Sequence, residues 1–162
     1  MHRFFFATKD TFINSGSNQI TGEDFKDKNT GQDEILELKK VFWNRDFHYQ
    51  TRALIQFDSD EIENFISSSN IGSTSYSASL RLYETKGTSG LSETYKIAAY
   101  PVSQSWSEGV GKESDRPKTT DGVSWKNRQY PAGGAEVAWA TVGGSYIASD
   151  EVTQSFSAES PD

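Results

Sequence analysis

Residues 47–57 read FHYQTRALIQF and form the clearest strand signal in the chain. Aromatic and β-branched side chains are frequent in this stretch, and such side chains favour the pleated conformation of a strand. The alternation from Ala53 to Phe57 fits a sheet that is covered on most of both faces. We therefore predict a core strand over 47–57 as the centre of the fold.

Further strand-like pieces lie on both sides of this stretch, at 3–13, 34–43, 76–83, 94–102, 123–125, 137–139 and 152–156. Clusters of Gly, Asn and Ser separate them, and these residues favour turns. We expect 76–83 and 94–102 to pair antiparallel across such a turn, while 34–43 leaves a helical turn open at Ile35 and Leu36. Many short strands with turn signals between them predict an all-β sandwich or barrel.

One short helix is predicted, at 58–66. A serine N-cap candidate comes at its start, and acidic residues fill its first turn, where they interact favourably with the helix dipole. Ile62, Phe65 and Ile66 have the spacing of one helical face. This is the only segment for which we predict a helix.

Composition limits the function classes. A chain of 162 residues predicts a single domain over 1–162. A net charge of −7 argues against nucleic-acid binding, because such binding relies on Lys and Arg that neutralise phosphates. We also expect no membrane span and no secretion signal, since the apolar run near the start is too short for either. The absence of cysteine excludes disulfides and thiolate metal sites.

Few residues point to chemistry. His2 and His48 lie far apart in sequence, which gives little basis for a histidine metal site or a catalytic triad. A carboxylate pair of glycosidase type is not excluded by the number of acidic residues, but most of these lie in polar loops. The segment 109–114 lacks the spacing of a phosphate loop. The loop 22–29 offers oxygen ligands of the kind that calcium prefers, so calcium is the one cofactor left open.

The four tryptophans allow a sugar-binding site as an alternative to a catalytic or metal site. Together with the tyrosines, they could form a platform on which sugar rings stack, and they lie at Trp43, Trp106, Trp125 and Trp139. For most of these rings, packing in the core is the favoured interpretation, since large aromatic side chains are the main source of buried apolar area in this chain.

Five short motifs occur in an order that resembles a known family. The stretches 7–13, 52–58, 78–83, 106–111 and 121–125 together resemble the DNRLRE family. This family is the disaggregatase-related β-sandwich, similar to carbohydrate-binding modules, of surface, secreted and viral structural proteins. The resemblance implies a jelly-roll-like antiparallel sandwich that binds polysaccharide or serves as an adhesive building block. The chain is also similar to structural virion proteins of tailed phages, of the T4-like and marine cyanobacterial kind.

The chain departs from the family pattern near its end. Members of the family usually continue past a segment like 153–156 into further strands, whereas this sequence stops at Asp162. Missing strands leave open sheet edges, which a protein has to cover or pair. We therefore expect either a sandwich without its last strands or a sheet that a neighbouring subunit completes.

These observations give two function classes. The first is a non-enzymatic structural component of a phage virion, in the tail, neck or capsid, assembled in the host cytoplasm in many copies beside other virion proteins. The alternative is a carbohydrate-binding module for host polysaccharide, and a polysaccharide lyase or hydrolase ranks last. In either case we expect the ligand or partner site at Trp106, Glu108, Asp121 and Trp125, where Gly109, Gly111 and Gly122 allow sharp turns.

Overall fold

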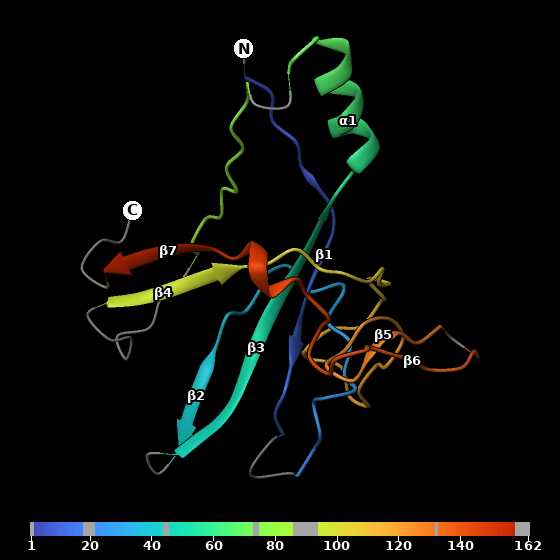
Figure 1. Ribbon diagram of the computed structural model, residues 1–162. Helices are drawn as coiled ribbons and strands as arrows, with labels where there is room; N and C mark the ends of the chain where they lie inside the picture. The colour runs from blue at the N-terminus through green and yellow to red at the C-terminus, as the bar shows by residue number, and fades with distance from the viewer. Residues whose placement is uncertain are drawn as a thin grey trace. The chain divides into compact units, whose positions relative to one another are not determined.

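The computed structural model describes residues 2–17, 22–43, 46–72, 75–85, 94–131 and 133–157. The elements in chain order are β1 (Ala7–Asn14), β2 (Lys40–Trp43), β3 (Asp46–Phe57), α1 (Ser59–Ser68), β4 (Thr94–Ala99), β5 (Asn127–Gln129), β6 (Val137–Ala138), the short 3-10 helix η1 (Ala148–Asp150) and β7 (Val152–Ser157) (Figure 1). All strand pairs between these elements are antiparallel, which confirms the all-β prediction. The predicted short helix forms as α1, the one α-helix in the described ranges.

The chain folds into two compact units. Unit 1 comprises Met1–Ser59 and Val102–Ser145, and unit 2 comprises Asp60–Pro101 and Tyr146–Asp162. Each unit thus combines two stretches that are far apart in sequence. Within the described ranges, all buried hydrophobic side chains belong to unit 1: Phe12, Ile13, Phe25, Leu54, Trp106, Val123 and Trp139.

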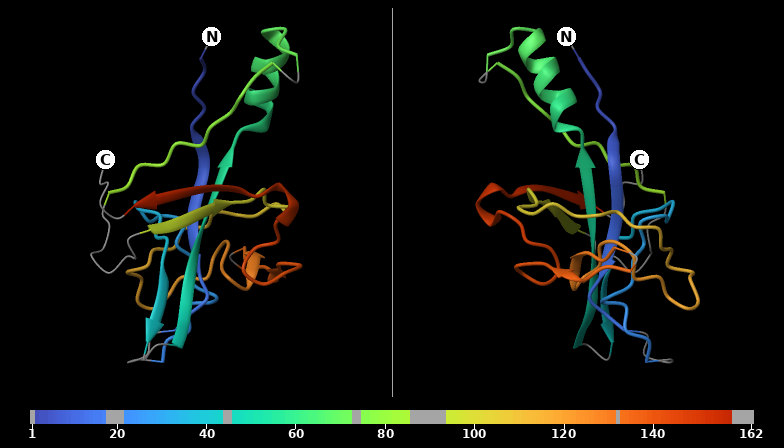
Figure 2. Two further views of the ribbon diagram at one scale, coloured as in Figure 1. Left: turned by 60° about the vertical axis from the view of Figure 1, so that its left-hand side comes forward. Right: turned by 90° about the vertical axis from the view of Figure 1, so that its right-hand side faces the viewer.

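Unit 1 is built on the long strand β3, as the opening motif of the sequence predicts. The C-terminal half of β3 pairs with β1, from Ala7 opposite Phe57 to Asn14 opposite Thr51. Its N-terminal half pairs with β2 along the other edge, which gives the strand order β1-β3-β2. The views in Figure 2 show β1 and β3 running side by side. The two neighbours of β3 are therefore staggered along it.

The core of unit 1 lies between this sheet and the segment 102–145. Ile13 of β1 and Leu54 of β3 pack with three side chains from that segment: Trp106, Val123 and Trp139. The covering layer consists mainly of loops, with the short β5–β6 pair as its only strands in the described ranges. Phe12 is also buried, and because neighbouring strand residues face opposite sides, it lies on the other face of the sheet from Ile13.

Unit 2 contains the β4–β7 pair and helix α1. The two strands pair antiparallel from Thr94 opposite Ser157 to Ala99 opposite Val152, and the rings of Tyr95 and Phe156 stack with centroids 5.4 Å apart. Helix α1 buries none of its residues. It is also no candidate for a membrane span, and neither is any other helix in the described ranges.

Two strand predictions, 76–83 and 123–125, are wrong, and a third, 34–43, is right only at its C-terminal end. The stretch 76–83 is exposed and lies outside every strand, and β4 pairs with β7 instead of with this stretch. Of 34–43, only Lys40–Trp43 forms a strand, and 123–125 forms none. Alternating side chains show which residues suit a strand, but hydrogen bonds to a neighbouring strand decide whether one forms. That neighbour is a property of the tertiary fold.

Candidate functional site

The loops of unit 1 are held together by a buried asparagine. Asn29 is fully buried, and its Nδ2 group donates hydrogen bonds to the carbonyls of Glu108, at 2.7 Å, and Val123, at 2.8 Å. Its Oδ1 atom accepts from the amides of Gly31, at 3.1 Å, and Gly111, at 2.8 Å. All four hydrogen bonds of the amide group are thus made, as a buried polar group requires. One side chain joins three loops that are distant in sequence.

Two glycines allow these loops to approach one another. Gly109 has φ +85° and Gly122 has φ +106°, a region that side chains other than glycine rarely adopt. A Cβ atom on Gly109 would lie 2.1 Å from the carbonyl oxygen of Asp121, and one on Gly122 would lie 2.4 Å from Cα of Gly109. The loops carrying Glu108 and Asp121 therefore meet backbone against backbone.

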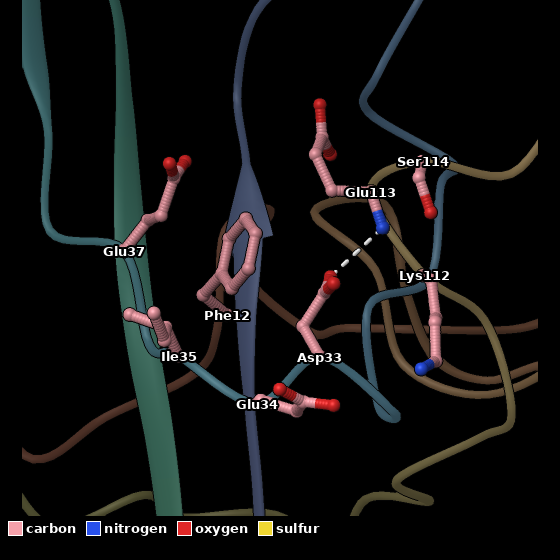
Figure 3. Close-up of a pocket in the computed structure, with 8 residues that line it drawn as sticks. All are labelled: Phe12, Asp33, Glu34, Ile35, Glu37, Lys112, Glu113 and Ser114. Carbon is pink, nitrogen blue, oxygen red and sulfur yellow. Dashed lines mark hydrogen bonds between the residues drawn. The ribbon is translucent and has the colours of Figure 1, made fainter.

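A pocket of about 370 Å³ opens beside these loops (Figure 3). Its walls come from the segment before β2 and from the loop after Gly111, and its floor from β1. The lining residues are Phe12, Asp33, Glu34, Ile35, Glu37, Lys112, Glu113 and Ser114. Four of them carry carboxyl groups and one carries an ammonium group, so we call this feature the acidic pocket.

Hydrogen bonds fix the two walls of the acidic pocket to each other. The Asp33 carboxylate accepts a hydrogen bond of 2.8 Å from the amide of Glu113, and the two residues come from opposite walls. The ammonium group of Lys28, whose side chain is 1% exposed, donates to the carbonyl of Glu113 and lies 3.8 Å from its carboxylate. The Lys28 ammonium group and the backbone amide of Glu113 together hold the loop that carries Glu113 in place.

The environment of Glu113 changes its acidity. Burial raises the pKa of Glu113 above its ordinary value of 4.5, because a carboxylate loses solvation there. Lys28 opposes this effect, while the negative charges of Glu37 and Asp33 add to it. Glu113 is therefore more easily protonated than an ordinary surface glutamate. A positive charge brought into the pocket would favour its ionised form.

The four residues that the sequence predicts as a binding site lie in two different environments. Trp106 is 5% exposed and lies in the core, and Trp125 is partly buried against that core with the Arg52 guanidinium 4.9 Å from its ring. Glu108 and Asp121 lie on the loops that meet, and the Glu108 carboxylate accepts a hydrogen bond of 2.8 Å from the amide of Asp10. The loops that carry the two acidic residues meet, whereas the two rings serve mainly in packing. Binding of a ligand or partner by these four residues stays a prediction.

In the loop 22–29, where the sequence leaves a calcium site open, carboxylate and carbonyl oxygens contact cationic side chains. Lys118 donates to the carbonyl of Asp24, at 2.8 Å, and to the carboxylate of Asp27, at 2.6 Å. Lys126 lies 3.0 Å from the Asp24 carboxylate. Burial raises the pKa of Asp24, but hydrogen bonds from Lys26 and Lys126 outweigh this effect and hold the pKa below its ordinary value.

These contacts place positive charge where a metal ion would compete for the same oxygens. No cluster of His, Cys, Asp or Glu in the described ranges has an arrangement that could hold a metal ion. Calcium binding stays a prediction.

Sequence reasoning missed the acidic pocket. Its local signal is the acidic run Asp33, Glu34 and Glu37, which resembles the other polar loops of the chain. Glu113 joins this run only in space, since it is 80 residues away from its partner Asp33. No spacing rule connects two such segments.

Comparison with known proteins gives one match. A family model, that of carbohydrate-binding module family 96, matches residues 2–146. This agrees with the character expected from the motifs, which is that of a carbohydrate-binding module, while the DNRLRE name and the phage link stay predictions. Neither the curated proteins nor the solved structures contain a match.

Proposed function

The chain belongs to carbohydrate-binding module family 96, and from this premise we propose that it is a non-catalytic module that binds polysaccharide in the acidic pocket of unit 1. The family match carries this proposal, because it covers the described part of unit 1 and every residue that lines the pocket. Families of this kind are defined by binding and not by catalysis, which is consistent with the expectation that the chain is not an enzyme.

The acidic pocket has the features that a sugar needs. Its volume lies at the lower end of the range of about 300–1,000 Å³ for small-molecule sites, which suits a short stretch of a sugar chain. Carboxylates accept hydrogen bonds from sugar hydroxyls, and Lys112 and Ser114 can donate them. Ile35, with 55% of its surface exposed, offers an apolar contact at the rim.

Calorimetric titration of the full chain with a panel of polysaccharide fragments tests this proposal. We expect the double variant Asp33→Asn with Glu34→Gln to weaken binding about tenfold or more, because charge-assisted hydrogen bonds are stronger than neutral ones. Circular dichroism of the variant checks that it is folded. A folded double variant that binds as tightly as the wild type would place the site elsewhere.

The loops that carry Glu108 and Asp121 are the second location for a sugar, as expected from the sequence. Asp121→Asn in the same titrations separates the two locations, since Asp121 does not line the acidic pocket. A loss of affinity in Asp121→Asn with none in the pocket variant would assign binding to the loops beside Trp125.

A structural role in a tailed-phage virion, with other virion proteins as partners in a multi-copy assembly, stays a prediction. The family match favours carbohydrate recognition over it. Mass spectrometry of gradient-purified particles would decide this point, and peptides from 53–81 at stoichiometric copy number would establish a virion component.

A further inference from the structure

Strand β7 of unit 2 has an outer edge without a neighbouring strand. The β4–β7 sheet consists of two strands in the described ranges, so the edge of β7 that faces away from β4 has no strand to pair with (Figure 1). Every β7 side chain that the structure describes, from Val152 to Phe156, is exposed. An edge of this kind is a template on which a strand of another chain can pair.

The sequence of β7 lacks the charged side chains that usually protect such an edge. Natural proteins place charged residues, above all lysine, on edge strands, because a charge opposes pairing with another chain. All other strands of more than two residues in the described ranges carry at least one charged residue, and on β4 this residue is Lys96. β7 reads VTQSFS and has none. The sheet is therefore protected along β4 and open to pairing along β7.

The two faces of the β4–β7 sheet differ in polarity. Residues directly opposite each other in an antiparallel pair lie on the same face, and neighbours along a strand lie on opposite faces. Lys96, Thr153 and Ser155 thus share one face. The other face has no charged residue, although Val152 on it is 71% exposed and Phe156 is 41% exposed. This apolar face consists of three opposing pairs: Tyr95 with Phe156, Ile97 with Gln154, and Ala99 with Val152.

The β7 strand is complementary to itself in an antiparallel arrangement. If Gln154 lies opposite Gln154 of a second copy, Val152 of each copy lies opposite Phe156 of the other. Both contacts combine a β-branched and an aromatic side chain, which stabilises antiparallel strands. The two Gln154 amides can donate hydrogen bonds to each other. Glu151, which directly precedes β7, lies opposite position 157 of the second copy and not opposite another carboxylate.

We propose that the chain forms a dimer in which β7 pairs antiparallel with β7 of a second copy, with Gln154 at the two-fold axis. The two sheets then join into one sheet of four strands in the order β4-β7-β7-β4, with both apolar faces on the same side. The added strands stabilise each two-stranded sheet, which by itself is marginally stable in water. This dimer does not depend on sugar binding by unit 1.

The expected dimer is weak. Stable interfaces between proteins bury about 1,200–2,000 Å² of total surface, which is more than two strands of six residues provide. We therefore expect the dimer to form at high protein concentration and to dissociate on dilution.

Cysteine cross-linking of the full chain tests which edge pairs. The sequence contains no cysteine, so a single introduced cysteine can form a disulfide only with the cysteine of another copy. Gln154→Cys places the two thiols directly opposite each other, with Cβ atoms about 4.5–5.5 Å apart, close to the distance that a disulfide needs. We expect several-fold more disulfide-linked dimer on a non-reducing gel than for Ala98→Cys, the exposed matched control on β4.

A second cysteine variant, Thr153→Cys, tests the register. In the proposed dimer Thr153 lies opposite Ser155 of the second copy, so two cysteines at 153 are diagonal neighbours about 7–8 Å apart and cross-link less than those at 154. More cross-linking at 153 than at 154 would overturn the register. Equal cross-linking of Gln154→Cys and Ala98→Cys would show random collision of exposed thiols and would overturn pairing through β7.

Sedimentation equilibrium of the full chain measures the affinity without cysteine. Gln154→Lys places two like charges directly opposite each other, which destabilises a strand pair, and Ala98→Lys adds the same charge on β4. We expect Gln154→Lys to raise the dissociation constant of the dimer about tenfold or more and Ala98→Lys to change it little. Circular dichroism checks that both variants are folded. A wild-type chain that stays monomeric at its highest soluble concentration, or an equal effect of both lysines, would overturn the inference.

Discussion

Trp106 shows how burial changes the role of a residue that sequence reasoning assigns to ligand binding. Its ring packs with Ile13 and Leu54 in the core of unit 1. We expect Trp106→Ala to lower the free energy of unfolding by about 3–5 kcal/mol, since it leaves a large cavity. Urea denaturation measures this, with the exposed Val110→Ala as a control that changes stability little. A stable Trp106→Ala variant that no longer binds sugar would restore Trp106 as a ligand residue.

The protonation of Glu113 in the acidic pocket makes the stability of the protein depend on pH. Burial raises its pKa above 4.5 in the folded protein, so the folded chain holds the proton to a higher pH than the unfolded chain does. The contribution of Glu113 to stability therefore falls as the pH rises from about 4.5 through the raised pKa. We expect urea denaturation across this window to show a smaller loss of stability for Glu113→Gln than for the wild type. An NMR titration that finds the Glu113 pKa at or below 4.5 would contradict this.

Among the structural elements, the loops of unit 1 depend on one another through Asn29. Asn29→Asp keeps the shape of the side chain but replaces the Nδ2 donor with an oxygen that faces the carbonyls of Glu108 and Val123. Two hydrogen bonds become repulsive contacts in a buried place, so we expect a loss of about 3 kcal/mol or more in the free energy of unfolding. Asn64→Asp, on the exposed surface of α1, is the matched control.

The effect of Asn29→Asp can also be measured as a change in sugar binding at the acidic pocket. Because Asn29 also holds Gly31 and Gly111, which precede the two walls, Asn29→Asp should weaken sugar binding even under conditions where the variant remains folded. Unchanged stability and unchanged binding would mean that the three loops hold their positions without this side chain.

The elements that could be predicted are those whose signal is local. The helix α1 and the strand β3 have periodic apolar side chains, and both form where expected. The stretch 76–83 has an equally regular alternation and forms no strand. The difference lies in the neighbours: β3 has a strand along each edge, and the described residues of 76–83 have none. A strand needs a neighbouring strand to pair with, and its own residues do not determine which segment that is.

At the scale of the whole molecule, the β4–β7 pair of unit 2 is a region open to association. Two strands alone are marginally stable in water, and this pair exposes Val152, at 71%, and Phe156, at 41%. If a neighbouring subunit completes the sheet, hydrogen exchange at 94–99 and 152–157 should slow as the protein concentration rises, and light scattering should show a growing mass. A monomer whose amides in both strands are fully protected would contradict this.

The sequence by itself determined the all-β class, the central strand, the short helix α1 and the character of a carbohydrate-binding module, because these follow from side-chain periodicity and from motif order. Only the tertiary structure decided which rings are buried, which strands pair and where the acidic pocket lies. Asp33 and Glu113 are 80 residues apart, and a hydrogen bond across the fold joins them. Burial and electrostatic interaction depend on distance in space, which the local pattern of a sequence does not contain.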